Sequence, residues 1–235
     1  LAPPPNEGQT QWWRDPRTRA LLNVLRLRTP PVSLVYGSTS GVYGDCSGDW
    51  APESRPLRPR TPRAQRRADA EHMVRLWGRS AAGSGQTGYR RTSLLRIPGI
   101  YAPDRVGGTP RARLLKRSPV LEAVDDVYTN HIHADDLARA CVAILWRGRA
   151  QRIYNVNDDS QLKMGAYFDL AADMYGLPRP PRVSRENAVH ELSVMVLSFM
   201  SESRRMDNRR IKRELGFQFK YPTVATGLIE PSCSP

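Results

Sequence analysis

The chain has 235 residues, of which 40% are hydrophobic, enough for one domain with a sizeable core and a small appendage. Its net charge of +13 would favour a polyanionic partner, but only four of the 36 basic residues are lysines and the arginines are scattered along the chain, so nucleic-acid binding is disfavoured. Three cysteines without CxxC spacing and the absence of any bilayer-length apolar run predict a cytoplasmic protein with no membrane partner.

The first predicted elements are a helix and a strand. Asp15-Pro16 supplies an N-cap with proline at the first helical position, and Pro30-Pro31 ends that helix. Residues 32–36 form a short apolar run, typical of a buried strand, which breaks into small hydroxylated residues and glycines over residues 37–41. Parallel strands end in this way where a ligand approaches the backbone. The long loop over residues 46–60 is therefore a candidate functional loop.

A second helix and strand complete a βαβ unit, which predicts a parallel sheet. Thr61-Pro62 repeats the cap-plus-proline signal, and the helix that follows carries an apolar face through Val74 and Trp77. Residues 81–89, rich in Gly and Ser, are expected to form a surface loop, and residues 92–97 form the next strand.

The rest of the chain is predicted to be mainly helical. We expect a basic helix over residues 107–117, an extended segment over 119–128, and a helix after His133 with an Asp as its N-cap. Residues 151–156 form a third strand candidate. Further helices are expected around residues 167–174, 184–200 and 207–215, and the Arg204-Arg205 pair is expected at the surface.

Six motifs occur in an order that resembles the extended short-chain dehydrogenase/reductase superfamily, also called the NAD-dependent epimerase/dehydratase family. They are Ser38-Thr39-Ser40-Gly41-Val42-Tyr43-Gly44, Ala70-Glu71, Leu95-Arg96-Ile97-Pro98-Gly99-Ile100-Tyr101-Ala102-Pro103, His133-Ala134-Asp135-Asp136-Leu137-Ala138, Tyr154-Asn155-Val156 and Lys212-Arg213-Glu214-Leu215-Gly216. The resemblance implies an α/β fold with a doubly wound, Rossmann-like parallel sheet, truncated at its N-terminus, and a small, mostly helical C-terminal substrate lobe. We expect the division at residues 1–160 and 161–235.

The resemblance also implies NAD or NADP as cofactor. The glycine-rich turn of the family, which holds the cofactor pyrophosphate, would lie upstream of Leu1, and Leu1-Ala2-Pro3 would be the end of a family strand. We therefore expect residues 1–235 alone to bind either dinucleotide weakly.

The catalytic Tyr-Lys pair of the family is replaced here. Arg63 falls on the Tyr position and Arg67 on the Lys position, while Thr39 falls on the position of the catalytic Ser or Thr. Arg67 retains a fixed positive charge for the ribose, but Arg63 cannot exchange a proton near neutrality. The chain thus resembles the atypical branch of the superfamily. Replacement acids or bases are sought among Tyr43, Asp45, His131 and His133.

The carboxyl ends of the first two strands are predicted to face one cleft. Pro98 and Gly99 would offer a flat wall to a nicotinamide ring, and the Thr39 hydroxyl would lie opposite. The expected cofactor contacts are Ala2, Pro3, Gly37, Ser38, Arg67, Ile97, Pro98 and Gly99. The expected substrate contacts are Ser40, Tyr43, Arg63, Asn130 and His133.

Simpler interpretations stand beside these roles. Ser38 and Thr39 would satisfy backbone groups at a strand end, Arg63 and Arg67 would form a solvated helix face, and Asp135 would be a helix cap. His131 and His133 lack the Cys or Glu neighbours of a metal site, so no metal is expected. Two functions stay open: an NAD(P)-dependent oxidoreductase or epimerase acting on a small molecule, free or nucleotide-linked, and a non-catalytic dinucleotide-binding sensor or scaffold. The number of subunits, one or several, is also left open.

Overall fold

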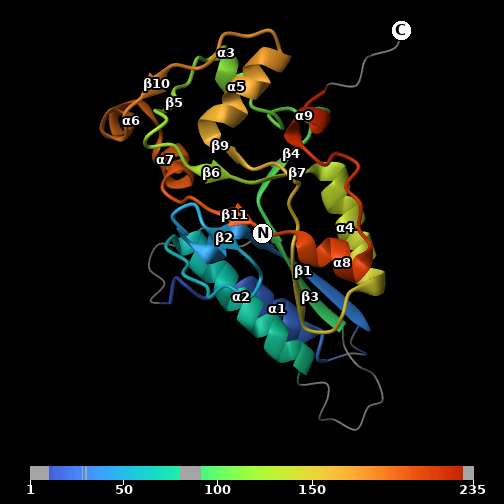
Figure 1. Cartoon of the computed structure of the whole chain (residues 1–235). Helices are drawn as coiled ribbons and strands as arrows, with labels where there is room; N and C mark the ends of the chain where they lie inside the picture. The colour runs from blue at the N-terminus through green and yellow to red at the C-terminus, as the bar shows by residue number, and fades with distance from the viewer. Residues whose placement is uncertain (1–10, 28, 30, 80–90, 230–235) are drawn as a thin grey trace.

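A parallel three-stranded sheet forms the centre of the molecule (Figure 1). The computed structural model describes residues 11–27, 29, 31–79 and 91–229. Within them the strand order is β1 (Ser33–Thr39), β3 (Arg91–Ile97) and β8 (Arg152–Asn155), and both neighbouring pairs are parallel. The predicted α/β fold and the parallel βαβ unit are therefore confirmed.

Helices α1 (Pro16–Val24) and α2 (Pro62–Arg79) cover one face of this sheet. The Asp15 carboxylate caps α1 by accepting from two backbone N–H groups of its first turn, as the Asp15-Pro16 motif predicts. Leu22 of α1, Val74 and Trp77 of α2 and Leu94 of β3 make one buried cluster between the helices and the sheet. The apolar stripe of each helix thus fixes which face it turns inward.

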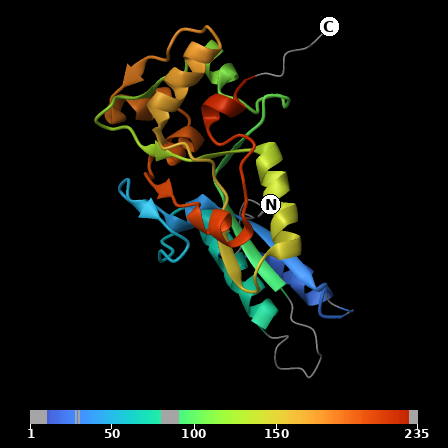
Figure 2. The ribbon, with the colours of Figure 1, turned by 45° about the vertical axis from the view of Figure 1, so that its right-hand side comes forward.

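Helices α4 (Ala134–Arg147) and α8 (Arg209–Leu215) lie on the other face (Figure 2). Successive side chains of a strand point to opposite faces, so Leu95 of β3 packs here while its neighbour Leu94 packs under α1 and α2. Ile144 of α4 and Ile211 of α8 complete this second cluster. The result is a three-layer α/β/α sandwich.

A second, smaller lobe sits beyond the carboxyl ends of the strands. Its core is a separate cluster that includes Val120, Phe168, Ala188 and Leu228. Its helices are short, and its strands have two or three residues each and form two-stranded sheets. The lobe elements and their connections are η1 (Ser40–Tyr43), β2 (Trp50–Ala51), β4 (Gly99–Tyr101), α3 (Arg111–Leu115), β5 (Val120–Leu121), β6 (Tyr128–Thr129), β7 (His131–His133), β9 (Leu162–Lys163), α5 (Met164–Met174), β10 (Arg182–Val183), α6 (Arg185–Glu191), α7 (Val194–Met200), β11 (Arg205–Met206) and α9 (Val224–Gly227).

The cores do not divide the chain at residue 160 as expected. Leu114 and Val120 precede that position yet pack in the lobe, whereas Ile211 and Leu215 follow it and pack against the sheet. The chain therefore crosses between sheet and lobe several times. The predicted helix over residues 107–117 is also shortened to the five residues of α3.

Candidate functional site

The carboxyl ends of β1 and β3 lie side by side, as the sequence predicts. Thr39 pairs in register with Ile97, so the hydroxylated end of β1 is directly beside Pro98 and Gly99. Gly37 and Gly99 are exposed, and Thr39, Ser40, Ile97 and Pro98 are half-buried. The Thr39 hydroxyl accepts from the Gly41 N–H at 3.3 Å and so begins η1. Its capping role and its predicted catalytic role thus share one oxygen.

Ser38 and Arg67 leave polar atoms without partners beside this surface. Ser38 is 5% exposed, and its Oγ has no hydrogen-bond partner among the described residues. Arg67 projects from α2 to β1, where its Nη1 donates to the Gly37 carbonyl oxygen at 3.0 Å and to the Tyr36 hydroxyl at 2.9 Å. Its Nε is buried and unpartnered. Buried polar groups are rarely left in this state, which makes Ser38 and Arg67 candidates for a functional role.

Arg63 does not share this environment. It is exposed on the first turn of α2 and makes no ion pair within residues 11–79 or 91–229. The solvated-face interpretation therefore fits Arg63 and is wrong for Arg67, which is 7% exposed.

A ring of contacts joins the strand ends to the smaller lobe. The Gly99 N–H donates to the Asn130 carbonyl oxygen at 3.2 Å, and the Asn130 side chain donates to the Arg204 carbonyl oxygen at 3.0 Å. Arg204 then donates from Nε to the Gly44 carbonyl oxygen at 3.0 Å, and Gly44 ends η1. Asn130 therefore lies next to the strand ends, where the sequence predicts a substrate contact.

Arg204 also forms an ion pair with Glu202. Both residues are buried, at 8% and 9% exposed, so the expected surface position of Arg204 is wrong. The Oε1 atom of Glu202 has no partner among the described residues. Sequence reasoning missed Glu202 because a single Glu in a polar segment gives no periodic signal, and only the fold brings it to Gly44.

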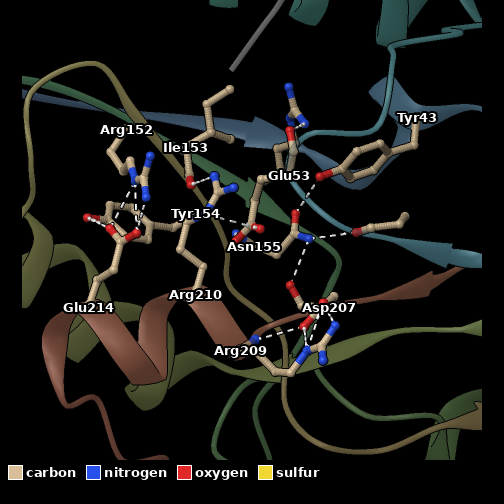
Figure 3. A network of polar contacts seen from close by, with 12 residues as sticks. Tyr43, Glu53, Arg152, Ile153, Tyr154, Asn155, Asp207, Arg209, Arg210 and Glu214 are labelled. Carbon is tan, nitrogen blue, oxygen red and sulfur yellow. Dashed lines mark hydrogen bonds and ion pairs between the residues drawn. The ribbon is translucent and has the colours of Figure 1, made fainter.

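Tyr43 belongs to a buried polar network rather than to an open surface (Figure 3). Its hydroxyl donates to Asn155 Oδ1 at 2.7 Å, and the Asn155 side chain donates to the carbonyl oxygens of Ala51 and Asp207. Burial raises the pKa of Tyr43 to about 12. The expected substrate contact of Tyr43 does not fit this placement, because the side chain is 1% exposed and its hydroxyl is occupied.

The same network holds β8 to α8 through ion pairs. Glu53 accepts from the Asn155 N–H at 3.0 Å and pairs with Arg210 at 3.4 Å. Burial raises the pKa of the Glu53 carboxyl. Figure 3 shows Arg152 and Glu214 meeting on the other side of the strand, where they form a further ion pair. Through these contacts the Tyr154-Asn155 motif serves to hold β8 in place.

His133, and not an Asp, caps helix α4. Its Nδ1 accepts from the Asp135 N–H at 3.1 Å, and its ring packs against Tyr221. The predicted Asp cap is therefore wrong. Asp136 is instead fully buried and accepts from the N–H groups of Lys220 and Tyr221, which anchors a distant loop. His133 is 5% exposed, so its expected contact with substrate does not fit this placement either.

His131 is buried and neutral. Its ring stacks on the Tyr167 ring, with the two ring centroids 4.0 Å apart, and burial lowers the pKa of His131 to about 3. An imidazole that stays neutral through the physiological range is a poor general base. Asp45, the remaining candidate, is half-buried and accepts from the N–H groups of Ser47 and Ser203, and these bonds lower its pKa despite the opposing effect of burial.

A cavity of about 570 Å³ lies beside the ring, between the segment after β8 and the segment around β11. Asn130 belongs to the ring of contacts and also lines the cavity. Thr39 and Pro98 do not line the cavity. Burial raises the pKa of Asp158, another lining residue, to about 7, and the Asp159 and Asp136 carboxylates add to the rise. The volume is in the range of small-molecule pockets.

The remaining predictions concern absent groups and undescribed residues. Ala2 and Pro3 lie outside the described residues. Within the described ranges no cluster of three or more His, Cys, Asp or Glu side chains has an arrangement that could hold a metal ion. None of the helices in the same ranges is both long and apolar enough to cross a bilayer.

A family model described as the NAD dependent epimerase/dehydratase family matches residues 17–157, which include β1, α2, β3 and the ring residue Asn130. The chain belongs to this family. The Escherichia coli K12 protein YeeZ is 23% identical over 189 residues, which cover 80% of this chain and 58% of YeeZ. The chain therefore spans less than two thirds of the length of this curated relative.

Two solved structures have the same fold. A functionally unknown conserved protein from Silicibacter pomeroyi is 30% identical, with a TM-score of 0.76, over 96% of this chain and 73% of that one. The human epimerase family protein SDR39U1, solved with NADPH, is 15% identical, with a TM-score of 0.70, over 97% of this chain and 77% of that one. At that identity the human structure supports the fold alone.

Proposed function

We propose that the carboxyl ends of β1 and β3 bind the nicotinamide ring and its ribose, and that the protein is an NAD(P)-dependent oxidoreductase or epimerase-like enzyme. The observation that carries the proposal is the pair of unpartnered polar atoms, Ser38 Oγ and Arg67 Nε, beside the exposed backbone of Gly37. Family membership supports the cofactor class. The substrate is a small molecule, free or linked to a nucleotide, that approaches from the side of Asn130.

The residues present fit one end of the cofactor. The Arg67 guanidinium would offer a donor to a ribose hydroxyl, the Ser38 hydroxyl can donate or accept, and Gly99, which is exposed, adds no side chain where the ring would lie. A nicotinamide cofactor supplies hydride chemistry when bound. In this proposal these residues hold the reacting end of the cofactor.

Proton exchange is assigned to Glu202 in this proposal. Arg63 and Arg67 stay protonated, Tyr43 is occupied, and His131 is held neutral. Glu202 keeps one carboxylate oxygen without a partner, and its pairing with Arg204 holds it beside Gly44 at the end of η1. A carboxylate fixed in this way can take a proton from a substrate hydroxyl.

A non-catalytic dinucleotide sensor is the second candidate. The observation in its favour is the replacement of the Tyr-Lys pair by two arginines, one of which, Arg63, is exposed. Such a protein would retain the binding surface of Gly37, Ser38 and Arg67 without turnover.

Amide NMR with NADH tests where the cofactor binds. The proposal predicts that adding NADH shifts the backbone signals of residues 37–40 and 97–99, and leaves those of residues 157–161 in the cavity unchanged. Shifts confined to residues 157–161 would contradict the proposed site. Glu202→Gln separates the two functions: it preserves the NADH-induced shifts in both, and it abolishes substrate-dependent formation of reduced nicotinamide only if the protein is an enzyme.

A further inference from the structure

Helices α1 and α2 present a surface of arginines without ion partners. Several cations elsewhere in the described residues pair with a carboxylate, as Arg96 does with Glu71 and Arg182 with Asp169. Within residues 11–27, 29, 31–79 and 91–229, no such pair is formed by a set of arginines on α1, on α2 and just before or after α1. This set, which we call the basic face, comprises Arg14, Arg17, Arg19, Arg26, Arg63, Arg75 and Arg79.

No carboxylate neutralises the basic face. Residues 11–27 and 62–79 contain three acidic residues. Asp15 is 2% exposed, and its carboxylate accepts hydrogen bonds that cap α1. Glu71 is 2% exposed and pairs with Arg96. Asp69 is half-buried and accepts from the Asp15 N–H at 2.9 Å. The positive charge is therefore concentrated here, although the arginines are scattered in the sequence.

Large apolar side chains are exposed among these arginines. Trp12 and Trp13 precede α1 and are 38% and 43% exposed, and their rings meet edge to face at 5.9 Å. Leu21 and Val24 lie three residues apart on α1, and Leu27 comes three residues after the end of the helix; they are 52%, 58% and 83% exposed. Residues three apart share one side of a helix, so α1 carries an outer apolar row flanked by arginines.

The two helices make one continuous surface. Asp15 contacts Asp69 near the start of α1, and Leu22 packs with Val74 and Trp77 farther along, so α1 and α2 run in the same direction side by side. Figures 1 and 2 show both helices on the outer side of the sheet, away from α4 and the smaller lobe.

We propose that α1, with the basic face, binds the surface of an anionic lipid bilayer. Arginines near such a surface are attracted to its phosphates, while tryptophans and leucines on the same helix enter the headgroup region, which is the pattern of interfacial amphipathic helices. Surface binding requires no membrane-spanning helix. Association with a second copy would place two basic faces together and is opposed by repulsion. A nucleic acid would neutralise the arginines but leave Leu21, Val24 and Leu27 exposed to water.

Vesicle flotation tests this surface in the full chain of residues 1–235. At low salt the chain should bind phosphatidylcholine vesicles that contain phosphatidylglycerol at least about tenfold more tightly than phosphatidylcholine vesicles alone, and high salt should weaken that binding. Arg17→Gln with Arg19→Gln and Arg26→Gln should weaken it by about tenfold or more. A variant with the same loss of charge elsewhere, Arg105→Gln with Arg147→Gln and Arg149→Gln, should bind as the unaltered chain does.

A second variant separates a bilayer from other partners. Leu21→Gln with Val24→Gln and Leu27→Gln keeps every charge, and circular dichroism checks that it folds. The proposal predicts loss of vesicle binding by this variant. Retained vesicle binding would overturn the apolar part of the proposal. Tight binding of duplex DNA in place of vesicles, or a dimer in light scattering that dissociates in this variant, would overturn the proposal in favour of a nucleic acid or a second copy.

Discussion

The guanidinium of Arg67 donates to the Gly37 carbonyl oxygen at 3.0 Å, which ties helix α2 to β1, an edge strand of the three-stranded sheet in the described residues. Edge strands expose backbone groups that need partners. The Nε of the same side chain is buried and has no hydrogen-bond partner among the described residues. One residue thus has a structural task and the geometry for a ligand contact.

The Arg96–Glu71 ion pair is predicted to be essential for stability. Arg96 donates from Nε and Nη2 to the two Glu71 oxygens, and both side chains are 3% exposed. Glu71→Gln leaves a buried guanidinium without its counter-charge, so the free energy of unfolding should fall by about 3 kcal/mol. Denaturant unfolding measures this loss. Asp173→Asn, which breaks an exposed and solvent-screened pair with Arg179, should cost much less, and an equal loss in both variants would refute the prediction.

Gly44→Ala should be strongly destabilising. Gly44 has a φ of +66°, and an added Cβ would lie 2.1 Å from the Arg58 carbonyl oxygen. We expect a loss of about 3 kcal/mol or more in thermal or denaturant unfolding, because the backbone must shift. Gly176→Ala is the matched control: its φ is +62°, its surroundings are open, and only about 1 kcal/mol of left-handed strain should appear. Similar values for the two variants would show that the contact with Arg58 is not limiting.

Asp158 should make stability fall as the pH rises. Its folded-state pKa is about 7 against an ordinary 3.8, so the folded state binds the proton more tightly than the unfolded state does. Protonated Asp158 therefore adds about 4 kcal/mol to the free energy of unfolding. This stabilisation is fully present below pH 4 and is lost as the pH rises through 7. Asp158→Asn removes this dependence. The difference in unfolding free energy between the unaltered chain and this variant should change by that amount between pH 4 and pH 8; a constant difference would count against a raised pKa.

The order of elements was predictable because capping and periodicity are local. Asp15-Pro16 and Thr61-Pro62 mark the starts of α1 and α2, and the alternation of side chains between the two faces of a strand puts Leu94 and Leu95 in different clusters. The cap of α4 was not predictable from local sequence: His133 occupies the N-cap position, and Asp136 accepts from the distant backbone of Lys220 and Tyr221.

The candidate site was predictable in part. The adjacency of Thr39 and Ile97 follows from a βαβ unit, and Asn130 comes close to Gly99 as the resemblance implies. Arg204 and Glu202 could not be placed from sequence, because their burial depends on contacts with Gly44, about 160 residues earlier in the chain. The burial of Tyr43 likewise depends on its distant partner Asn155.

The most direct test of the proposed site is the binding of nicotinamide mononucleotide, which carries the ring, ribose and phosphate, to Arg67 and Arg63 variants by calorimetry. Arg67→Met should weaken binding by about tenfold or more, because a charged donor beside Ser38 is lost, while Arg67→Lys should recover part of it. Arg63→Met, on the exposed start of the same helix, should leave the dissociation constant unchanged. Denaturant unfolding confirms that each variant is folded. Undiminished binding by a folded Arg67→Met variant would contradict the proposed site.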